Sequence, residues 1–199
     1  MTVLFIVLAI LLGIAIVFTI AFPYLYHFIY RRRYHHIYAH KMYRLAMNKD
    51  YYLINKLVLN SHDSQQLVID HLMFGNKYIY LIHDFYCEAS LYGKDCDNSL
   101  LVRSKKGNSY VENPLDVAKQ QLKELSVLIN FDESLFVPIA LVNDSCNIMN
   151  NDNKSLVYAR KIKDVIASYE SRDVDPLNQE QMMFAVHDIA RLNLRDVKK

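Results

Sequence analysis

The chain has 199 residues, of which 52% are hydrophobic and 12% aromatic, with only four glycines and four prolines. This length supports one domain of ordinary size, and the composition excludes a disordered, collagen-like or disulfide-stapled chain. Residues 1–49 hold six basic groups and no acidic group, so residues 50–199, with 17 basic and 21 acidic groups, form an acidic body that disfavours broad nucleic-acid affinity.

The first predicted element is a membrane-spanning helix. Residues 3–22 carry no charge, and as a helix they would span roughly 30 Å, the thickness of the hydrocarbon core of a bilayer. A cleavable signal peptide would have basic residues before this run and a small-residue cleavage site after it, so we expect the helix to be retained. The alternative is a buried core helix of a soluble protein, which the length of the uncharged run disfavours.

Aromatic and basic residues follow the apolar run and predict its orientation. Residues 24–30 contain three tyrosines and a phenylalanine, which suit the membrane interface, and three arginines come directly after them. The positive-inside tendency places the N-terminus outside the cell and the main domain in the cytoplasm. The lipid bilayer is therefore the expected partner, and anionic headgroups would attract the five cations of this region: Arg31, Arg32, Arg33, Lys41 and Arg44.

The three cysteines carry a prediction about the compartment. Cys87, Cys96 and Cys146 are odd in number and widely spaced, which indicates reduced thiols in the cytoplasm and no zinc motif.

The body begins with strand patterns. After a short helix within the basic juxtamembrane segment 31–49, residues 51–59 are rich in aromatic and branched side chains and predict a strand. Residues 65–74 and 77–85 flank Gly75-Asn76, a turn pair, and predict an antiparallel hairpin. Shorter strands are expected at residues 89–92 and 100–103, followed by a turn at residues 105–108.

The second half of the body alternates helices and strands. Asn113-Pro114 predicts a helix start, and the helix has an apolar stripe that includes Leu122. Buried strands are expected at residues 136–142 and 155–158, with an Asn-rich loop at residues 143–153 between them. Two helices close the chain, the second capped and started by Asp175-Pro176. This order predicts an α/β fold for residues 50–199, a mixed sheet flanked by helices, behind a membrane anchor at residues 1–30.

One segment carries a family resemblance. Residues 64–72 read Ser-Gln-Gln-Leu-Val-Ile-Asp-His-Leu and are followed by Gly75 and a second apolar strand, Tyr78-Ile79-Tyr80-Leu81-Ile82. Together with Leu91-Tyr92-Gly93 and Asn113-Pro114-Leu115, this segment resembles the nuclease-related domain (NERD) family over roughly residues 35–145. The resemblance implies a restriction-endonuclease-like fold with an Asp and a Glu-x-Lys signature.

The nuclease residues that the resemblance implies are mostly replaced. In such nucleases two carboxylates hold a divalent cation, Mg²⁺ or Mn²⁺, and the Lys positions the nucleophile. Asp70 is present, but the Glu position is His83 and the Lys position is Phe85. The family's early-helix Glu falls among residues 39–41, where there is no acid, and its helix Gln falls on Val117.

Neighbouring residues offer incomplete substitutes. Asp84 lies beside the lost Glu, but alternation along a strand turns it to the face opposite His83, so it would reach Asp70 only through a bulge. His83 suits a transition metal better than Mg²⁺. Gln120 and Gln121 lie one turn after Val117 and offer a shifted amide contact. Asp70, His83 and Phe85 are also consistent with an ordinary turn carboxylate, a core or edge histidine and a core aromatic, which is the interpretation that the ligand count favours.

These observations predict a membrane-anchored domain that binds or supports other molecules without cleaving nucleic acid, and without a metal or other cofactor. One alternative is a divergent metal-dependent nuclease that uses Asp70 with His83 or Asp84. Another is an interaction subunit of a membrane assembly unrelated to nucleases. The sequence leaves the protein partner unidentified, and the net charge of the body disfavours nucleic acid.

Overall fold

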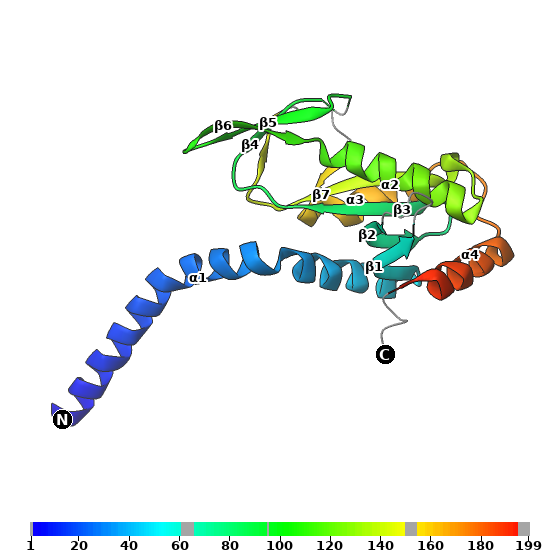
Figure 1. Cartoon of the computed structure of the whole chain (residues 1–199). Coiled ribbons are helices and arrows are strands. Elements are labelled where there is room, and N and C mark those ends of the chain that lie inside the picture. Colours follow the sequence, from blue (N-terminus) through cyan, green and yellow to red (C-terminus); the bar gives the residue numbers. More distant parts are fainter. Residues whose placement is uncertain (1, 61–65, 95, 150–154, 195–199) are drawn as a thin grey trace. The chain divides into compact units, whose positions relative to one another are not determined.

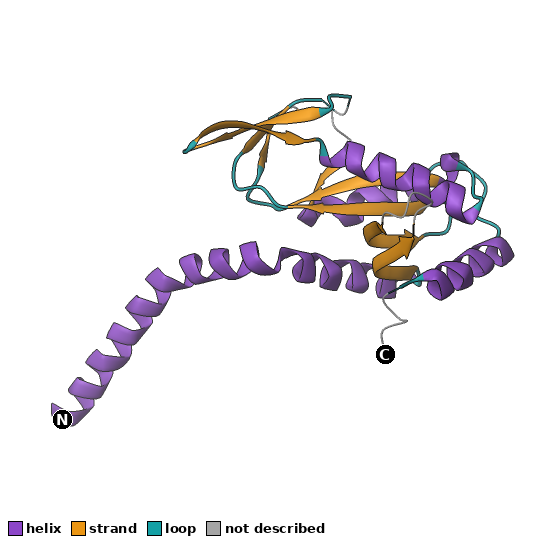
Figure 2. Cartoon of the chain, viewed as in Figure 1, coloured by secondary structure: helices purple, strands orange, loops and turns teal. Residues whose placement is uncertain are grey.

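The chain is an α/β protein, described here by a computed structural model over residues 2–60, 66–94, 96–149 and 155–194 (Figure 1). It contains two compact units, Met1–Ile37 and Tyr38–Lys199. A long apolar helix forms the first unit, and mixed sheets flanked by helices form the second. The fold class predicted from the sequence is therefore confirmed (Figure 2).

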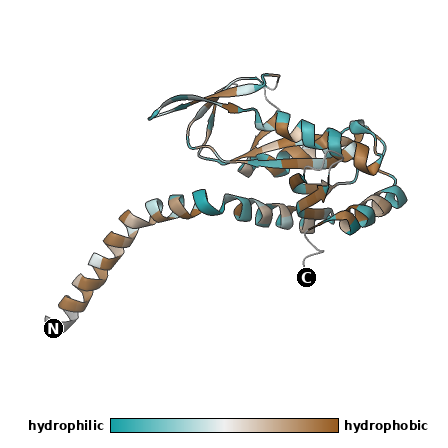
Figure 3. Ribbon diagram, viewed as in Figure 1, coloured by the Kyte–Doolittle hydropathy of each residue, from teal (hydrophilic) through white to brown (hydrophobic). Residues whose placement is uncertain are grey.

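Helix α1, Thr2–Lys49, contains the uncharged run and continues past it. Its N-terminal part is long and apolar enough to cross a membrane, and none of its most apolar window is buried in the protein (Figure 3). The helix kinks at Arg33, whose φ of −123° and ψ of 17° are not helical. The basic triplet therefore coincides with the break in the helix.

The last turns of α1 belong to the second unit. Tyr38, Met42, Leu45 and Ala46 are all at most 7% exposed, so this stretch supplies core residues of the body. Burial lowers the pKa of Lys41, and nearby Asp144 partly opposes that shift. Arg44 remains exposed. The juxtamembrane segment, which the sequence predicted to meet lipid, thus contributes to the core of the second unit.

The main sheet has five strands in the order β1-β2-β3-β7-β9. β1 pairs with β2 and β2 with β3 in antiparallel register, whereas β7 is parallel to both β3 and β9. The predicted hairpin at residues 65–85 is confirmed, although Gln65 itself lies outside the described residues. The strands are Tyr52–Asn60 (β1), Gln66–Phe74 (β2), Ile79–Phe85 (β3), Phe136–Val142 (β7) and Leu156–Tyr158 (β9).

A second, four-stranded sheet was not predicted. Its order is β6-β5-β4-β8, built from Ser90–Tyr92 (β4), Ser99–Ser104 (β5), Gly107–Glu112 (β6) and Asn147–Ile148 (β8). The sequence missed β6 because five of its six residues are exposed and show no apolar alternation. It missed β8 because two residues inside an Asn-rich segment become a strand only through pairing with β4.

Helix α2, Pro114–Ile129, begins as predicted: the side chain of Asn113 accepts a hydrogen bond from the backbone N–H of Leu115. Its apolar stripe packs on one face of the main sheet, in a cluster with Ile79 and Leu81 of β3. Tyr80 alternates with these two residues and so faces the other side of the sheet. There its hydroxyl donates to Glu170 at the end of α3, Ile162–Glu170, at 2.6 Å. The main sheet is thus covered on both faces.

The position of α2 gives a stability prediction. Leu122 is 6% exposed within the α2 cluster, so Leu122→Ala is expected to lower the free energy of unfolding by about 2–5 kcal/mol through lost burial and a cavity. Val127 lies on the same helix and is 68% exposed, so Val127→Ala should change it by less than about 0.5 kcal/mol. Urea titration of the detergent-solubilised protein, followed by circular dichroism, measures both. Equal losses would show that this stripe is not core.

The last helix starts later than the sequence predicted. Helix α4 is Gln179–Leu192, and Asn178 caps it by accepting hydrogen bonds from the backbone N–H groups of Glu180 and Gln181. The prediction of a start at Asp175-Pro176 is wrong, because the chain is not helical there and the N–H of Leu177 donates to the carbonyl of Asn76 at 2.7 Å. Ala185 and Ile189 of this helix face inward and join the α2 cluster.

Candidate functional site

The candidate site lies where β1 and β2 exchange their faces. In a regular strand Ile69 and Leu72 would point to opposite sides, yet both belong to the cluster under α2. The same change occurs in β1 between Ile54 and Leu57, the residues opposite them in register. Lys56, with a φ of 56°, provides the irregular backbone at this point. Asp70 and His71 therefore sit at a local distortion of the sheet.

His71 joins two other polar side chains inside the protein. Its Nε2 lies 2.9 Å from Oδ1 of Asp84, and its Nδ1 lies 2.7 Å from Oδ1 of Asn55. The side chains of His71 and Asp84 are 1% and 0% exposed. Each ring nitrogen of His71 thus faces an oxygen atom, and the tautomer of the ring sets which nitrogen donates. This network satisfies a buried carboxylate that would otherwise be costly.

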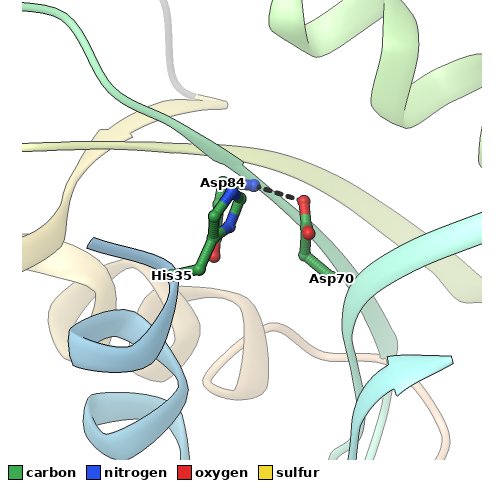
Figure 4. A group of neighbouring side chains, drawn as sticks. All are labelled: His35, Asp70 and Asp84. Carbon is green, nitrogen blue, oxygen red and sulfur yellow. Dashed lines mark hydrogen bonds between the residues drawn. The ribbon is translucent and has the colours of Figure 1, made fainter. Parts of the chain in front are cut away.

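Asp70, on β2, contacts the neighbouring strand β3. Its Oδ2 accepts a hydrogen bond from the backbone N–H of Asp84 at 3.0 Å, and Figure 4 shows this bond as a dashed line. The same oxygen lies 3.1 Å from Nδ1 of His83. One carboxylate oxygen of Asp70 and one of Asp84 lie within 4.8 Å of each other. Two carboxylates and two histidines thus meet at the middle of β2 and the end of β3.

Asp84 approaches Asp70 although it lies on the face that alternation predicts. Its side chain is on the face of β3 opposite His83, since Asp84 contacts His71 and His71 stands opposite Ile82 in register. The sequence predicted that Asp84 would reach Asp70 only through a bulge. The distortion of β2 at Asp70 is an irregularity of this kind, and it brings the two carboxylates together.

The other predicted site residues are placed less centrally. Phe85, at the Lys position, packs against a buried cluster that contains Leu91, Leu100 and Leu115. Gln120 is exposed. Gln121 donates from its amide nitrogen to the carbonyl of Val68 at 2.7 Å, two residues before Asp70, and its buried Oε1 has no hydrogen-bond partner among the described residues.

The chemistry available here is limited by what Asp84 already does. Oxygen ligands suit Mg²⁺ or Mn²⁺, and Asp70 with Asp84 offers one such pair, with water needed for the rest of the coordination shell. Binding a cation through Asp84 would compete with its hydrogen bond to His71. Asp70 and His83 are 16% and 22% exposed and form the part of the site that solvent reaches.

The comparison with protein families agrees with this arrangement. The model of the nuclease-related domain matches residues 37–143. The chain belongs to the NERD family. The alternative of an assembly subunit unrelated to nucleases assumed that the resemblance was accidental, and the family match contradicts that assumption. No curated protein and no solved structure matches the chain.

Sequence reasoning missed two members of this NERD site. His71 follows Asp70 directly in the motif, but its role depends on Asp84, which comes from the next strand. Asn55 and Lys56 interrupt the apolar pattern of β1, and that interruption was the available signal for a buried hydrogen-bond partner. Both are identified only once the three strands are placed side by side.

Proposed function

We propose that this NERD protein is a single-pass membrane protein whose nuclease-related domain acts at the cytoplasmic face as a binding or structural module and does not cleave nucleic acid. The observation that carries the proposal is the burial of the Asp84 carboxylate and its hydrogen bond. Asp84 is fully buried and hydrogen-bonded to His71, so it serves the interior of the domain. A catalytic metal needs carboxylates that face the substrate.

The residues at the two signature positions support the same function. His83, at the Glu position, lies with its Nδ1 3.1 Å from the Asp70 carboxylate and offers a ring nitrogen where the family has a second carboxylate. Phe85, at the Lys position, is packed among apolar side chains and has no group that orients a nucleophile. The site therefore keeps the Asp of the nuclease signature and lacks two of its other chemical parts.

The membrane location of the proposal depends on α1. An uncharged helix with an exposed apolar surface is stable in hydrocarbon and costly in water. The following arginines, Arg31 to Arg33, favour the cytoplasmic side and anionic headgroups. The basic groups of residues 31–49 and the net acidic charge of residues 50–199 together favour lipid over nucleic acid as the charged partner.

A second candidate function is a divergent metal-dependent nuclease that uses Asp70 and Asp84. The observation in its favour is the approach of their carboxylate oxygens to within 4.8 Å, a separation that a single divalent cation bridges. In this function Asp84 would exchange its bond to His71 for the metal.

A cleavage assay on the full-length protein in detergent separates the two candidates. We expect no cleavage of single- or double-stranded DNA or RNA with Mg²⁺ or Mn²⁺, and no metal site tighter than millimolar by titration. Cleavage that Asp70→Asn and Asp84→Asn each abolish would establish the nuclease instead. The matched control is Asp188→Asn, an exposed carboxylate on α4.

A gain-of-function variant tests the scaffold itself. His83→Glu with Phe85→Lys restores the family's signature beside Asp70 and should create metal binding that Asp70→Asn removes. Unchanged metal affinity in a folded double variant would count against a retained nuclease scaffold at this site.

A further inference from the structure

Two buried cysteines, outside the carboxylate site, lie at the junction between the two sheets. Cys87 follows β3 and Cys146 lies just before β8, and they are 5% and 4% exposed within one apolar cluster. The parallel pairing of β3 with β7 places Phe85 opposite Val142, and the chain segments that leave these strands carry the two cysteines. The third cysteine, Cys96, is exposed.

The backbone around Cys87 is held in place from the Cys146 side. The N–H of Cys87 donates to Oδ1 of Asn143 at 2.7 Å, and Nδ2 of Asn143 donates to the carbonyl of Cys87 at 2.8 Å. Asn143 is fully buried, and the N–H of Cys146 donates to its carbonyl at 3.1 Å. One residue thus fixes both cysteine-bearing segments, which limits how far the two sulfur atoms can separate.

The sulfur atoms share their surroundings. Sγ of Cys146 lies 3.4 Å and Sγ of Cys87 3.9 Å from the carbonyl oxygen of Ala89. The neighbouring Cys146 side chain lowers the pKa of Cys87 to about 7. The same neighbour, together with burial, raises the pKa of Cys146. Of the two thiols, Cys87 is therefore the one that ionises more readily near neutral pH.

We propose that Cys87 and Cys146 form a redox-active dithiol that closes to a disulfide on reaction with a small peroxide. The sulfur of Cys87 attacks one oxygen of hydrogen peroxide, the O–O bond breaks, and hydroxide leaves, which gives a sulfenic acid on Cys87. The sulfur of Cys146 then attacks the sulfur of Cys87. The S–O bond breaks, water leaves with the thiol proton, and the two cysteines are oxidised by two electrons while peroxide is reduced.

The position of the bond gives it a structural consequence. It would tie the segment after β3, three residues beyond Asp84, to the segment that enters the second sheet. The peroxide is small enough to reach side chains that are 5% and 4% exposed. Thiol reductants of the cytoplasm would reopen the bond.

The test uses the full-length protein with Cys96→Ser, treated with hydrogen peroxide at pH 7. We expect a mass loss of 2 Da that a reductant reverses, a peptide pair linking residues 87 and 146, and a rise of several degrees in melting temperature. Two cysteines that remain free, or that oxidise independently to higher acids without a linked peptide, would overturn the proposal.

Single variants assign the two roles. In Cys146→Ala the sulfenic acid on Cys87 should persist and react with dimedone, whereas in Cys87→Ala the Cys146 thiol should stay unmodified. Loss of the Cys146 thiol should also slow iodoacetamide alkylation of Cys87 at pH 7 by roughly tenfold, as the pKa of Cys87 returns toward the ordinary value. An unchanged alkylation rate would show that Cys146 does not activate Cys87. Far-UV circular dichroism of each variant separates these outcomes from unfolding.

Discussion

Asp84→Ala is expected to lower the free energy of unfolding by about 3–5 kcal/mol, because it removes one partner of a fully buried pair. His71 would lose the acceptor 2.9 Å from its Nε2 and keep a polar ring in an environment that is 1% exposed. A buried polar group without a hydrogen-bond partner destabilises the fold by the full free energy of its desolvation. Asp84→Asn keeps an acceptor in place, so we expect a smaller loss from that variant.

A double-mutant cycle identifies the origin of the loss. Asp84→Ala with His71→Ala should cost less than the sum of the single variants by about 1–3 kcal/mol, since neither group is then left unpaired. The matched control is Asp188→Ala, which removes the exposed partner of His187 at 3.9 Å and should change stability by less than about 0.5 kcal/mol. Denaturant unfolding of the detergent-solubilised protein measures all four variants. A loss below 1 kcal/mol for Asp84→Ala would show that the pair is dispensable for folding.

Two charges in the apolar part of α1 should release the protein from the membrane. Leu12→Asp with Ile16→Asp places carboxylates on one face of the helix near the centre of the uncharged run. Each is expected to cost about 2.5–3.5 kcal/mol of insertion free energy, or about 5–7 kcal/mol together. Alkaline-carbonate extraction of membranes should then find the variant in the soluble fraction and the unmodified protein in the pellet.

The control for this variant lies on the same helix. Met47 is 65% exposed and belongs to the second unit, so Met47→Asp should leave membrane retention unchanged. Orientation is read from Thr2→Cys and Met47→Cys in a background without native cysteines. An impermeant reagent applied to intact cells should label position 2 and spare position 47. The opposite labelling pattern would place the domain outside the cell. Release of the unmodified protein by alkaline carbonate would show that α1 is not a membrane anchor.

The sequence by itself determined the elements whose signals are local. The uncharged run predicted the first part of α1, Gly75-Asn76 between two apolar runs predicted the hairpin of β2 and β3, and Asn113-Pro114 predicted the start of α2. Each signal lies within the element it describes, because caps, turns and apolar periods act on neighbouring backbone groups. The NERD motif belongs here too, since its residues lie in order along the chain.

Only the tertiary structure decided which faces and partners these elements take. The end of α1 became core, and β6 and β8 became strands, through contacts with segments far along the chain. The start of α4 was set by a hydrogen bond between Leu177 and Asn76. Asp84 met Asp70 and His71 because two neighbouring strands change faces at the same point, and Cys87 met Cys146 because β3 and β7 run side by side. Alternation along one strand is a local rule, and an irregularity shared by two strands overrides it.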